Sequence, residues 1–422
     1  MTLDILLINP NTMMDPPVIP IGLEYLKTAL DKQNYSVKIL DLCFKSNPLR
    51  FLHNYLENHS NRLDIIGITI RNIDTSSFFT EKFFLPEIKD IVDGIKKFDI
   101  PVVLGGAGFS ALPSEILEYL GADYGIIGPG ERAFVKFLKD WQQGLIQSHL
   151  YNGWECELDE LIHYRGEEID YSKYISKEGI VGFELKKGCN NSCPYCIEAN
   201  KPVQYKSIAN VIKEIQYLVD KGYNHFHLCD SEFNLDLKHS IEFCESIIDN
   251  EIEMKWALYM KPTPYNRRLF KLLHESNAYL ITLSVDSDGT IQKLNNYSYE
   301  DLKKIIKYCQ EFKIKLAIDL LCGYPGESEH SVEKIIRFFK DHRPDTVGIT
   351  FYYRIYRTPL SILMKNNPEY HIKLTRKMNY KENFLKPIFF ANYNIEFFNN
   401  LIEGDDLFRI AGVRPGVNYQ LD

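Results

Sequence analysis

Three cysteines lie close together in the chain, namely Cys189, Cys193 and Cys196, at a Cys-x3-Cys-x2-Cys spacing. Three thiolates so close in sequence can bind one 4Fe-4S cluster, which leaves one of its four irons without a cysteine ligand. Such an iron can bind and reduce a small molecule. A structural zinc site is the alternative, but it usually needs four ligands, and the chain has no second closely spaced pair of cysteines.

The composition narrows the class of protein. The chain has 422 residues and nine cysteines, whereas disulfide frameworks belong to short secreted chains. The formal net charge is -8, so we expect no nucleic-acid partner. We also expect no signal peptide and no membrane span, because the chain lacks a basic leader and a long apolar run. Free thiols and an oxygen-sensitive cluster predict a reducing, cytoplasmic location.

Residues 1–145 show the pattern of buried strands separated by helices. The apolar runs are continuous, as in parallel strands that are buried on both faces, and helical patterns occupy Gly22–Lys32 and residues 113–120. This order predicts a doubly wound, Rossmann-like α/β sheet, in which ligands bind at the carboxyl ends of the strands. The predicted strands are Leu3–Ile8, Val37–Leu40, Ile65–Ile70, Val102–Leu104 and Tyr124–Ile127.

The loops at these strand ends are rich in glycine and polar residues. Glycines allow the backbone to approach a bulky ligand closely, although any single glycine can equally serve a tight turn. The loops are Asn9-Pro10-Asn11, Arg71-Asn72-Ile73-Asp74, Gly105-Gly106-Ala107-Gly108 and Gly128-Pro129-Gly130-Glu131.

The remainder of the chain divides into a connector, a second α/β repeat and a tail. Residues 146–178 are polar and acidic, and residues 361–422 are rich in Asn, Lys, Tyr and Phe. Between them, residues 179–360 contain six strand–helix units, with a core-facing helical stripe of Leu302, Ile305, Ile306 and Cys309 and a helix that Ser328 caps. We expect the tail to pack on the open side of this repeat. The predicted strands are Val181–Leu185, His225–Cys229, Trp256–Met260, Tyr279–Val285, Leu316–Leu321 and Val347–Tyr353.

The cysteine segment, Cys189-Asn190-Asn191-Ser192-Cys193-Pro194-Tyr195-Cys196, resembles the signature of the radical S-adenosylmethionine (SAM) enzymes. The resemblance implies a partial (β/α)6 barrel at residues 179–360 whose open iron binds the amino and carboxylate groups of SAM. It places Tyr195 beside the cluster and the adenine. It further assigns Asp230 or Glu232 to the SAM amino group, Ser284 and Asp286 to its ribose or carboxylate, and Arg354 to a carboxylate of SAM or substrate.

Each of these assignments has an ordinary structural alternative. Asp230 and Glu232 also fit an acidic loop, and Arg354 also fits a surface ion pair. Cys229 follows the second strand, where it could face a substrate, but we expect a core cysteine there. Cys156 is expected to be a spare or buried thiol.

The first 145 residues are similar to the cobalamin-binding domain that precedes many radical SAM barrels. The similarity rests on the opening Leu-Leu-Ile-Asn-Pro, on the helix start from Pro20, on Val103-Leu104-Gly105-Gly106, and on the run from Asp123 to Glu131. It departs at Pro129, where the family often has Glu. The resemblance implies cobalamin contacts from Asn9, Pro10, Arg71, Asn72, Asp74, Gly105, Gly106, Gly128, Gly130 and Glu131.

The segment lacks the Asp-x-His-x-x-Gly motif whose histidine ligates cobalt in many cobalamin proteins. Arg71 occupies the corresponding strand end, and a permanently charged guanidinium is a very poor metal ligand. Placed below cobalt, Arg71 would deny the lower axial position to any donor and would act in catalysis. This loop resembles that of the tryptophan 2-methyltransferase subgroup. The alternative is that Arg71 pairs with Asp74 or with a cofactor phosphate.

Taken together, these resemblances imply a cobalamin-dependent radical SAM enzyme. We expect a methyltransferase that moves a methyl group from SAM through methylcobalamin to an unactivated carbon or phosphorus centre of a small molecule or peptide. A flavodoxin or ferredoxin would supply electrons. The alternatives are a cyclase, mutase or oxidase without methyl transfer, a non-radical methylation of an aromatic carbon, and a sensor without turnover.

Overall fold

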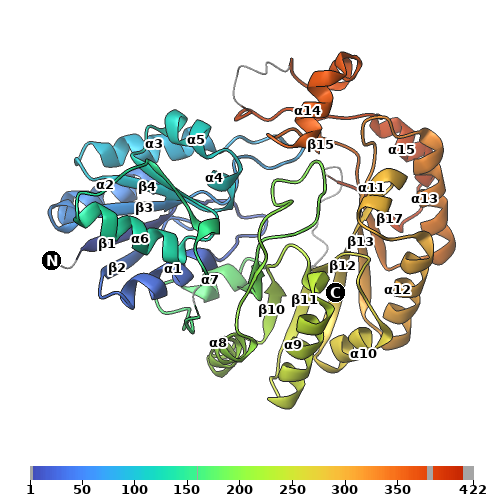
Figure 1. Cartoon of the computed structure of the whole chain (residues 1–422), viewed down its shortest axis with the longest axis horizontal. Helices are drawn as coiled ribbons and strands as arrows, with labels where there is room; N and C mark the ends of the chain where they lie inside the picture. The colour runs from blue at the N-terminus through green and yellow to red at the C-terminus, as the bar shows by residue number, and fades with distance from the viewer. Residues whose placement is uncertain (1–2, 159, 378–383, 412–422) are drawn as a thin grey trace. The chain divides into compact units, whose positions relative to one another are not determined.

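The computed structural model describes residues 3–158, 160–377 and 384–411, and the chain forms two compact units (Figure 1). The first unit comprises residues 1–75, 82–183 and 204–223, and the second comprises residues 76–81, 184–203 and 224–422. The predicted connector at 146–178 therefore belongs to the first unit. None of the helices in the described part of the chain is long and apolar enough to span a membrane.

The first unit contains a parallel sheet in the order β2-β1-β3-β4-β5-β6. Its strands confirm the five predicted apolar runs, and β6 adds a sixth from within the predicted connector. The chain adds β2 on one side of β1 and β3 on the other, so a topological switch point lies between β1 and β3. The strands are β1 (Asp4–Asn9), β2 (Ser36–Asp41), β3 (Ile65–Thr69), β4 (Val102–Gly105), β5 (Tyr124–Ile127) and β6 (Leu150–Asn152).

Helices cover this sheet because each has one apolar side. In α3, for example, Ile88, Ile91, Val92 and Ile95 are buried at helical spacing, while the intervening charged residues face solvent. The helices are α1 (Ile21–Asp31), α2 (Pro48–His59), α3 (Leu85–Lys96), α4 (Ala107–Ala111), α5 (Pro113–Leu120), α6 (Glu131–Gln142), α7 (Tyr171–Ile175) and α8 (Ile208–Asp220).

In the second unit, parallel strands lie in the order β17-β14-β13-β12-β11-β10. Five match predicted barrel strands, and the sixth predicted one is β7 (Val181–Phe183), which the first unit contains. The strands are β10 (His225–Leu228), β11 (Lys255–Met260), β12 (Ala278–Asp286), β13 (Lys315–Leu321), β14 (Thr346–Thr350) and β17 (Phe408–Ile410). A short antiparallel pair, β15 (Tyr353–Arg354) and β16 (Phe389–Phe390), follows.

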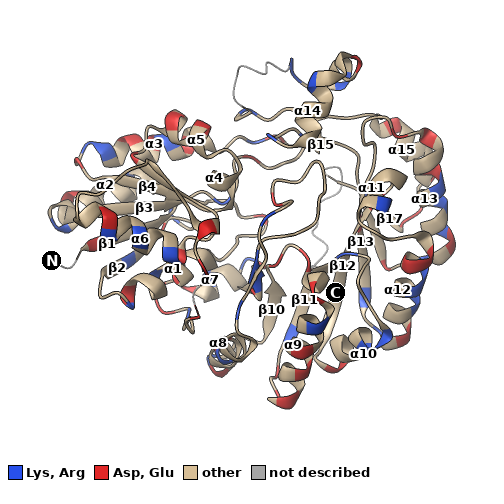
Figure 2. Ribbon diagram, in the orientation of Figure 1, with Lys and Arg blue, Asp and Glu red and all other residues tan. Residues whose placement is uncertain are grey.

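Figure 1 shows helices along the outer side of these strands, and both signs of charge alternate on their exposed surfaces in Figure 2. The predicted stripe from Leu302 to Cys309 is buried in α12, and the Ser328 hydroxyl accepts the Ser331 N–H at the start of α13, as predicted. The helices are α9 (Leu237–Asp249), α10 (Arg267–Glu275), α11 (Gly289–Leu294), α12 (Tyr299–Phe312), α13 (Glu329–His342), α14 (Pro359–Asn366) and α15 (Ile395–Ile402).

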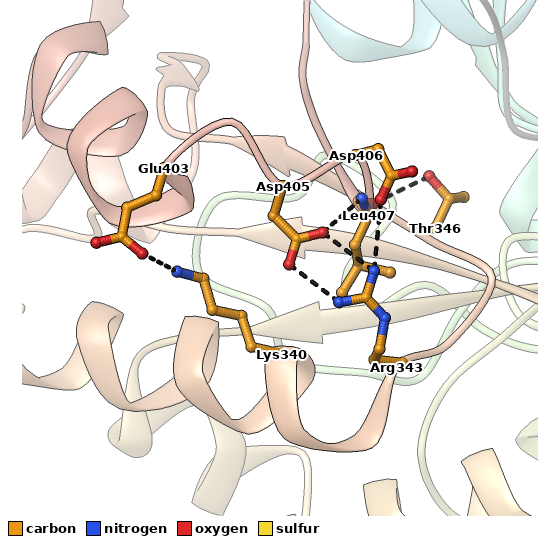
Figure 3. Close-up of polar contacts among 7 residues, drawn as sticks. All are labelled: Lys340, Arg343, Thr346, Glu403, Asp405, Asp406 and Leu407. Atoms are coloured by element: carbon orange, nitrogen blue, oxygen red, sulfur yellow. Dashed lines mark hydrogen bonds and ion pairs between the residues drawn. The ribbon is translucent and has the colours of Figure 1, made fainter.

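The tail supplies a strand that the sequence did not reveal. β17 pairs with β14 at the edge of the sheet. Ion pairs hold its start (Figure 3): Arg343 donates to both carboxylate oxygens of Asp405 at 3.0 and 3.1 Å and contacts Asp406 at 3.4 Å, and Lys340 pairs with Glu403 at 3.1 Å. The tail therefore extends the sheet as well as packing beside it.

Candidate functional site

The three clustered cysteines lie in a loop that hydrogen bonds to itself. The Cys196 amide donates to the Cys193 carbonyl at 3.2 Å, and the Lys201 amide donates to the Cys189 carbonyl at 2.9 Å. Gly188 has a φ of 82°, a backbone conformation that residues with a side chain rarely adopt. This glycine turns the chain into the loop. The loop thus brings the three thiols together, with Cys189 buried and the other two half-buried.

The surroundings of these thiols suit a metal cluster. Burial raises the pKa of Cys193 to about 12 and that of Cys196 to about 11, and the neighbouring thiols add to both shifts. Thiolates become stable in such a place when a metal supplies positive charge. All three thiols are free of disulfides, and three cysteine thiolates are a donor set that a 4Fe-4S cluster accepts.

Two residues that the sequence assigned to SAM lie in direct contact. The Tyr195 hydroxyl donates to the Asp286 carboxylate at 2.6 Å, which joins the cysteine loop to the end of β12. Burial raises the pKa of Asp286 to about 7. The Asn295 amide lies 3.6 Å from the Cys193 sulfur, a contact that sequence reasoning missed because an asparagine after a helix carries no metal signal.

Asp230 is buried at the strand end before the cysteine loop, and its assignment to SAM stays a prediction. Its carboxylate accepts the amide hydrogens of Leu185 and Lys186 at 3.0 and 3.3 Å, and it lies 3.5 Å from the Lys186 ammonium. Both side chains are only 1% exposed. Asp230 therefore holds the strand end before the cysteine loop, because a buried carboxylate needs donors and a cation around it.

Glu232, the second of the two predicted carboxylates, lies beside Ser284. It hydrogen bonds to Ser284, and burial raises its pKa to about 7 despite the nearby Lys186 and Lys261. Its Oε2 atom is buried and accepts no hydrogen bond. Lys261 in turn donates to Asn191 of the cysteine loop at 2.6 Å. Glu232 and Ser284 thus lie in contact, and the Oε2 atom of Glu232 remains available to accept a hydrogen bond.

Arg354 has partners within the protein, and its assignment to a carboxylate of SAM or substrate stays a prediction. Its guanidinium is buried and donates to the backbone carbonyls of Ile355, Phe384 and Leu385, so it fastens the C-terminal region. Cys229 is exposed, contrary to the expectation of a core cysteine, and Cys156 is half-buried.

In the first unit, a small pocket forms at the topological switch point. It is lined by the residues that follow β1 and β3 and by the start of α3. Its free volume is about 30 Å³. The lining residues are Pro10, Asn11, Thr12, Met13, Thr69, Arg71, Asn72, Phe84, Glu87 and Ile88.

The strand-end residues predicted to contact cobalamin differ in their exposure to solvent. Arg71 is exposed and lines the pocket with Asn72, as a cofactor contact requires. Asn9 is buried and donates to Asp41 at 2.9 Å, so it shapes the loop from within. Asp74 is buried and pairs in an isolated bridge with Phe83. Glu131 is buried in the first turn of α6. Only part of the predicted set therefore faces outward.

The glycines also divide into two groups. A Cβ on Gly106, whose φ is 97°, would lie 2.6 Å from the Ile70 carbonyl oxygen, and one on Gly128 would lie 2.4 Å from the Trp154 indole. These two glycines serve packing within the protein. Gly105 has only one atom, at 3.9 Å, near its Cβ direction and Gly130 has none within 4 Å, so open space remains for a bulky cofactor there. The sequence could not separate the groups, because their neighbours are distant in sequence.

Comparisons with known proteins match a separate family to each of two segments of the chain. The B12 binding domain matches residues 14–138, and the Radical SAM superfamily matches residues 183–339. A tryptophan 2-C-methyltransferase from Streptomyces laurentii is 24% identical over 407 residues, covering 76% of this chain and 67% of that protein. A cytidylyl-2-hydroxyethylphosphonate methyltransferase from Streptomyces wedmorensis is 22% identical, covering 77% and 74%. Other matches reach only about half the length of the curated relatives.

The fold has a close solved counterpart. The radical S-adenosylmethionine methyltransferase TsrM from Kitasatospora setae, solved with cobalamin and a [4Fe-4S] cluster, superposes with a TM-score of 0.87 at 22% identity, over 97% of this chain and 93% of that one. The order of the two domains, the cysteine loop and these likenesses lead to one assignment. The chain therefore combines a B12 binding domain with a domain of the Radical SAM superfamily, and it resembles cobalamin-dependent radical SAM methyltransferases along most of its length.

Proposed function

We propose that this enzyme transfers a methyl group from SAM, by way of cobalamin, to an unactivated carbon or phosphorus centre of a small molecule or peptide. Two methyltransferase relatives, one named for tryptophan and one for a phosphonate, support the reaction class. The observation that carries the proposal is Arg71, which lines the pocket at the switch point of the sheet, where an α/β sheet binds its ligand.

The residues present can hold the three cofactors. Cys189, Cys193 and Cys196 would bind the 4Fe-4S cluster, Glu232, Ser284, Asp286 and Tyr195 would surround SAM, and the first unit would bind cobalamin. When bound, cobalamin supplies a cobalt that carries methyl groups, and the cluster supplies electrons to SAM.

The chain's own residues then set the chemistry. An arginine cannot ligate cobalt, so Arg71 would keep the lower face of cobalamin free of a protein donor. The Tyr195–Asp286 hydrogen bond fixes the cysteine loop to the end of β12. The unused Oε2 acceptor of Glu232 suits an ammonium group. We further propose a flavodoxin or ferredoxin as electron donor and the cytoplasm as location, because nine free thiols need a reducing compartment.

Anaerobic turnover with methyl-labelled SAM tests the reaction. The reconstituted enzyme would be incubated with a library of metabolites and peptides that includes tryptophan, and products would be screened for a gain of one labelled methyl. Release of 5′-deoxyadenosine in step with product indicates a radical route. Methylation without it indicates direct attack by an aromatic carbon, which the tryptophan 2-C-methyltransferase relative favours as second candidate. A product without the label contradicts the proposal and supports a cyclase, mutase or oxidase.

Electron paramagnetic resonance of Co(II) tests the role of Arg71 independently of turnover. The wild-type enzyme should show no nitrogen coupling from a protein ligand. Arg71→His offers an imidazole at the same place and should introduce it, whereas Arg71→Lys should not. Nitrogen coupling in the wild type would contradict our assignment of the lower face.

A further inference from the structure

Backbone amides donate hydrogen bonds to two of the three clustered cysteine sulfurs. Cys189 accepts the amide of Asn191, and Cys196 accepts the amides that follow it two and three positions later. Such donors belong to the fold of the loop and do not depend on which side chains it carries. They suit a thiolate, which accepts hydrogen bonds and donates none. The loop is therefore arranged around sulfur atoms that carry negative charge.

The third sulfur, that of Cys193, has a side-chain neighbour from much later in the chain. The Asn295 Nδ2 atom lies 3.6 Å from the Cys193 Sγ atom, and the Asn295 Oδ1 atom lies 3.8 Å from it. A protonated thiol can donate to Oδ1, but a cysteine that binds a metal has lost its proton. Only the hydrogen bond from Nδ2 to the sulfur then remains. Metal binding therefore selects the amide nitrogen of Asn295 as the group that faces Cys193.

The backbone at Asn295 is held independently of this contact. The residue follows α11, and its amide donates to the Ile291 carbonyl at 2.9 Å. The Thr263 hydroxyl donates to the carbonyls of Asn295 and Asn296 at 3.3 and 3.0 Å. Asn295 has a φ of -90° and a ψ of 6°, so its conformation does not need an asparagine. The side chain can therefore be replaced while the backbone bonds that place it are kept.

Asn295 opposes the other influences on the charge of Cys193. Burial raises the pKa of the Cys193 thiol, and the nearby negative charge of Asp286 raises it further, whereas the hydrogen bond from Asn295 lowers it. The Asp286 carboxylate is itself held in place, because it accepts the Tyr195 hydroxyl at 2.6 Å. Asn295 thus supplies a donor where the surroundings otherwise disfavour negative charge on the sulfur.

A donor at this sulfur has a definite effect on an iron–sulfur cluster. Reduction adds one electron, and hence one negative charge, to a cluster that three thiolates already make anionic. A hydrogen bond to a ligating sulfur stabilises the more negative state more strongly, so it raises the reduction potential. The effect is larger in a partly buried place than in water, because the surroundings screen it less. Both Cys193 and Asn295 are half-buried.

We propose that Asn295 raises the reduction potential of the 4Fe-4S cluster by donating its side-chain N–H to the Cys193 sulfur. In the reduction step, a one-electron protein donor of the flavodoxin or ferredoxin class is oxidised and the cluster gains the electron, while no bond forms or breaks. Asn295 is a positioning residue in this step, because it acts through Cys193. The inference goes beyond the proposed methyl transfer, since it holds for any methyl acceptor, and it rests on the three cysteines as cluster ligands.

A redox titration of the anaerobic holoenzyme without SAM tests the proposal. The cluster would be reduced stepwise in the presence of redox mediators, and its reduced form would be followed by electron paramagnetic resonance. Asn295→Leu removes the N–H donor and nearly keeps the size of the side chain. The equilibrium constant for reduction should therefore fall about tenfold, which is a potential about 59 mV more negative. Asn295→Asp removes the donor and adds a negative charge, so its potential should be lower still.

Asn296→Asp is the matched control for the added charge. Asn296 is exposed, and aspartate tolerates its φ of 55° as asparagine does. Water and salt screen an exposed charge, so this variant should shift the potential much less than Asn295→Asp does. Iron content and cluster absorbance, measured before the titration, show whether each variant binds the cluster to the same extent as wild type.

Equal potentials in wild type and Asn295→Leu would overturn the proposal, and so would a more positive potential in the variant. If Asn295→Leu binds no cluster, a potential of Asn295→Asp no lower than that of Asn296→Asp would overturn it instead. A wild type that binds no cluster would remove the cysteine assignment together with this inference. Equal potentials in cluster-loaded proteins would leave that assignment, and the proposed methyl transfer, intact.

Discussion

Two strand-end glycines that look alike in sequence should respond in opposite ways to the same substitution. Gly106 has a φ of 97° and a ψ of 170°, a region that is almost confined to glycine. Its added Cβ would lie 2.6 Å from the Ile70 carbonyl oxygen and 2.8 Å from the Thr69 hydroxyl. Gly130 has a φ of -90° and a ψ of -24°, which any residue adopts, and no atom lies within 4 Å of its Cβ direction.

The cost of Gly106→Ala follows from these contacts. The backbone conformation costs an alanine about 1–3 kcal/mol, and overpacking against rigid backbone costs about 1–3 kcal/mol more. We therefore expect a loss of about 2–6 kcal/mol of folding free energy. The Ile70 carbonyl also accepts the Gly108 amide at 2.9 Å, so the strain should displace the loop that carries Arg71 and weaken cobalamin binding as well. Gly130→Ala should leave folding unchanged or stabilise it by about 0.5–1 kcal/mol.

Urea unfolding of the full-length protein without cobalamin, followed by fluorescence, measures the first effect, and cobalamin retained after gel filtration measures the second. Gly106→Ala should lower the urea midpoint by about 0.5–2 M, taking an m-value of about 3 kcal/mol/M or somewhat more for a chain of this size. Gly130→Ala should unfold like wild type yet retain less cobalamin, because its methyl group enters the space left for the cofactor. A Gly106→Ala midpoint equal to that of wild type would refute the steric argument.

Three further outcomes follow from contacts described above. Cys193→Ala should abolish the 4Fe-4S absorbance of the reconstituted enzyme and all cleavage of SAM, whereas Cys309→Ala, in the core of α12, should preserve both; SAM cleavage by the first variant would contradict the cluster assignment. Arg354→Gln removes the hydrogen bonds that the guanidinium donates to the carbonyls of Phe384 and Leu385, so limited proteolysis at residues 384–411 should become faster. An unchanged rate of digestion would contradict the anchoring role of Arg354. Hydrogen bonding to Arg343 lowers the pKa of Asp405, so the pair stabilises the fold fully above about pH 4 and loses this effect as pH falls through the lowered pKa of Asp405. Arg343→Gln should therefore reduce the melting temperature more at pH 7 than at pH 3, and an equal reduction at both would disprove the linkage.

Local sequence determined the parts of this protein that depend on neighbouring residues. The cysteine spacing fixed the candidate cluster loop, because three ligands within one loop need no tertiary information to lie close together. Continuous apolar runs fixed most of the strands, since a parallel strand is buried on both faces whatever its partners. The cap at Ser328 and the stripe in α12 were likewise readable, because helix ends and faces depend on residues three or four positions apart.

Tertiary structure decided which polar residues face a site and which serve the fold. Asp230 and Arg354 had suitable types and positions for SAM, but each also bonds to backbone groups distant in sequence: Asp230 accepts the Leu185 amide, and Arg354 donates to the Leu385 carbonyl. Gly106 and Gly130 differ only through neighbours and backbone angles that sequence does not display. No local pattern decides how a buried polar group obtains its hydrogen bonds.

The strand β17 is a second feature that the sequence alone did not predict. Three residues are too few for a periodic pattern, so Phe408–Ile410 gave no strand signal. Its place beside β14 comes from the ion pairs of Arg343 and from burial of Phe408 and Ile410, both of which join segments about 60 residues apart. The sequence therefore determined the cofactor class, whereas tertiary pairing decided which short segment completes the edge of the sheet, because strand pairing joins residues far apart in the chain.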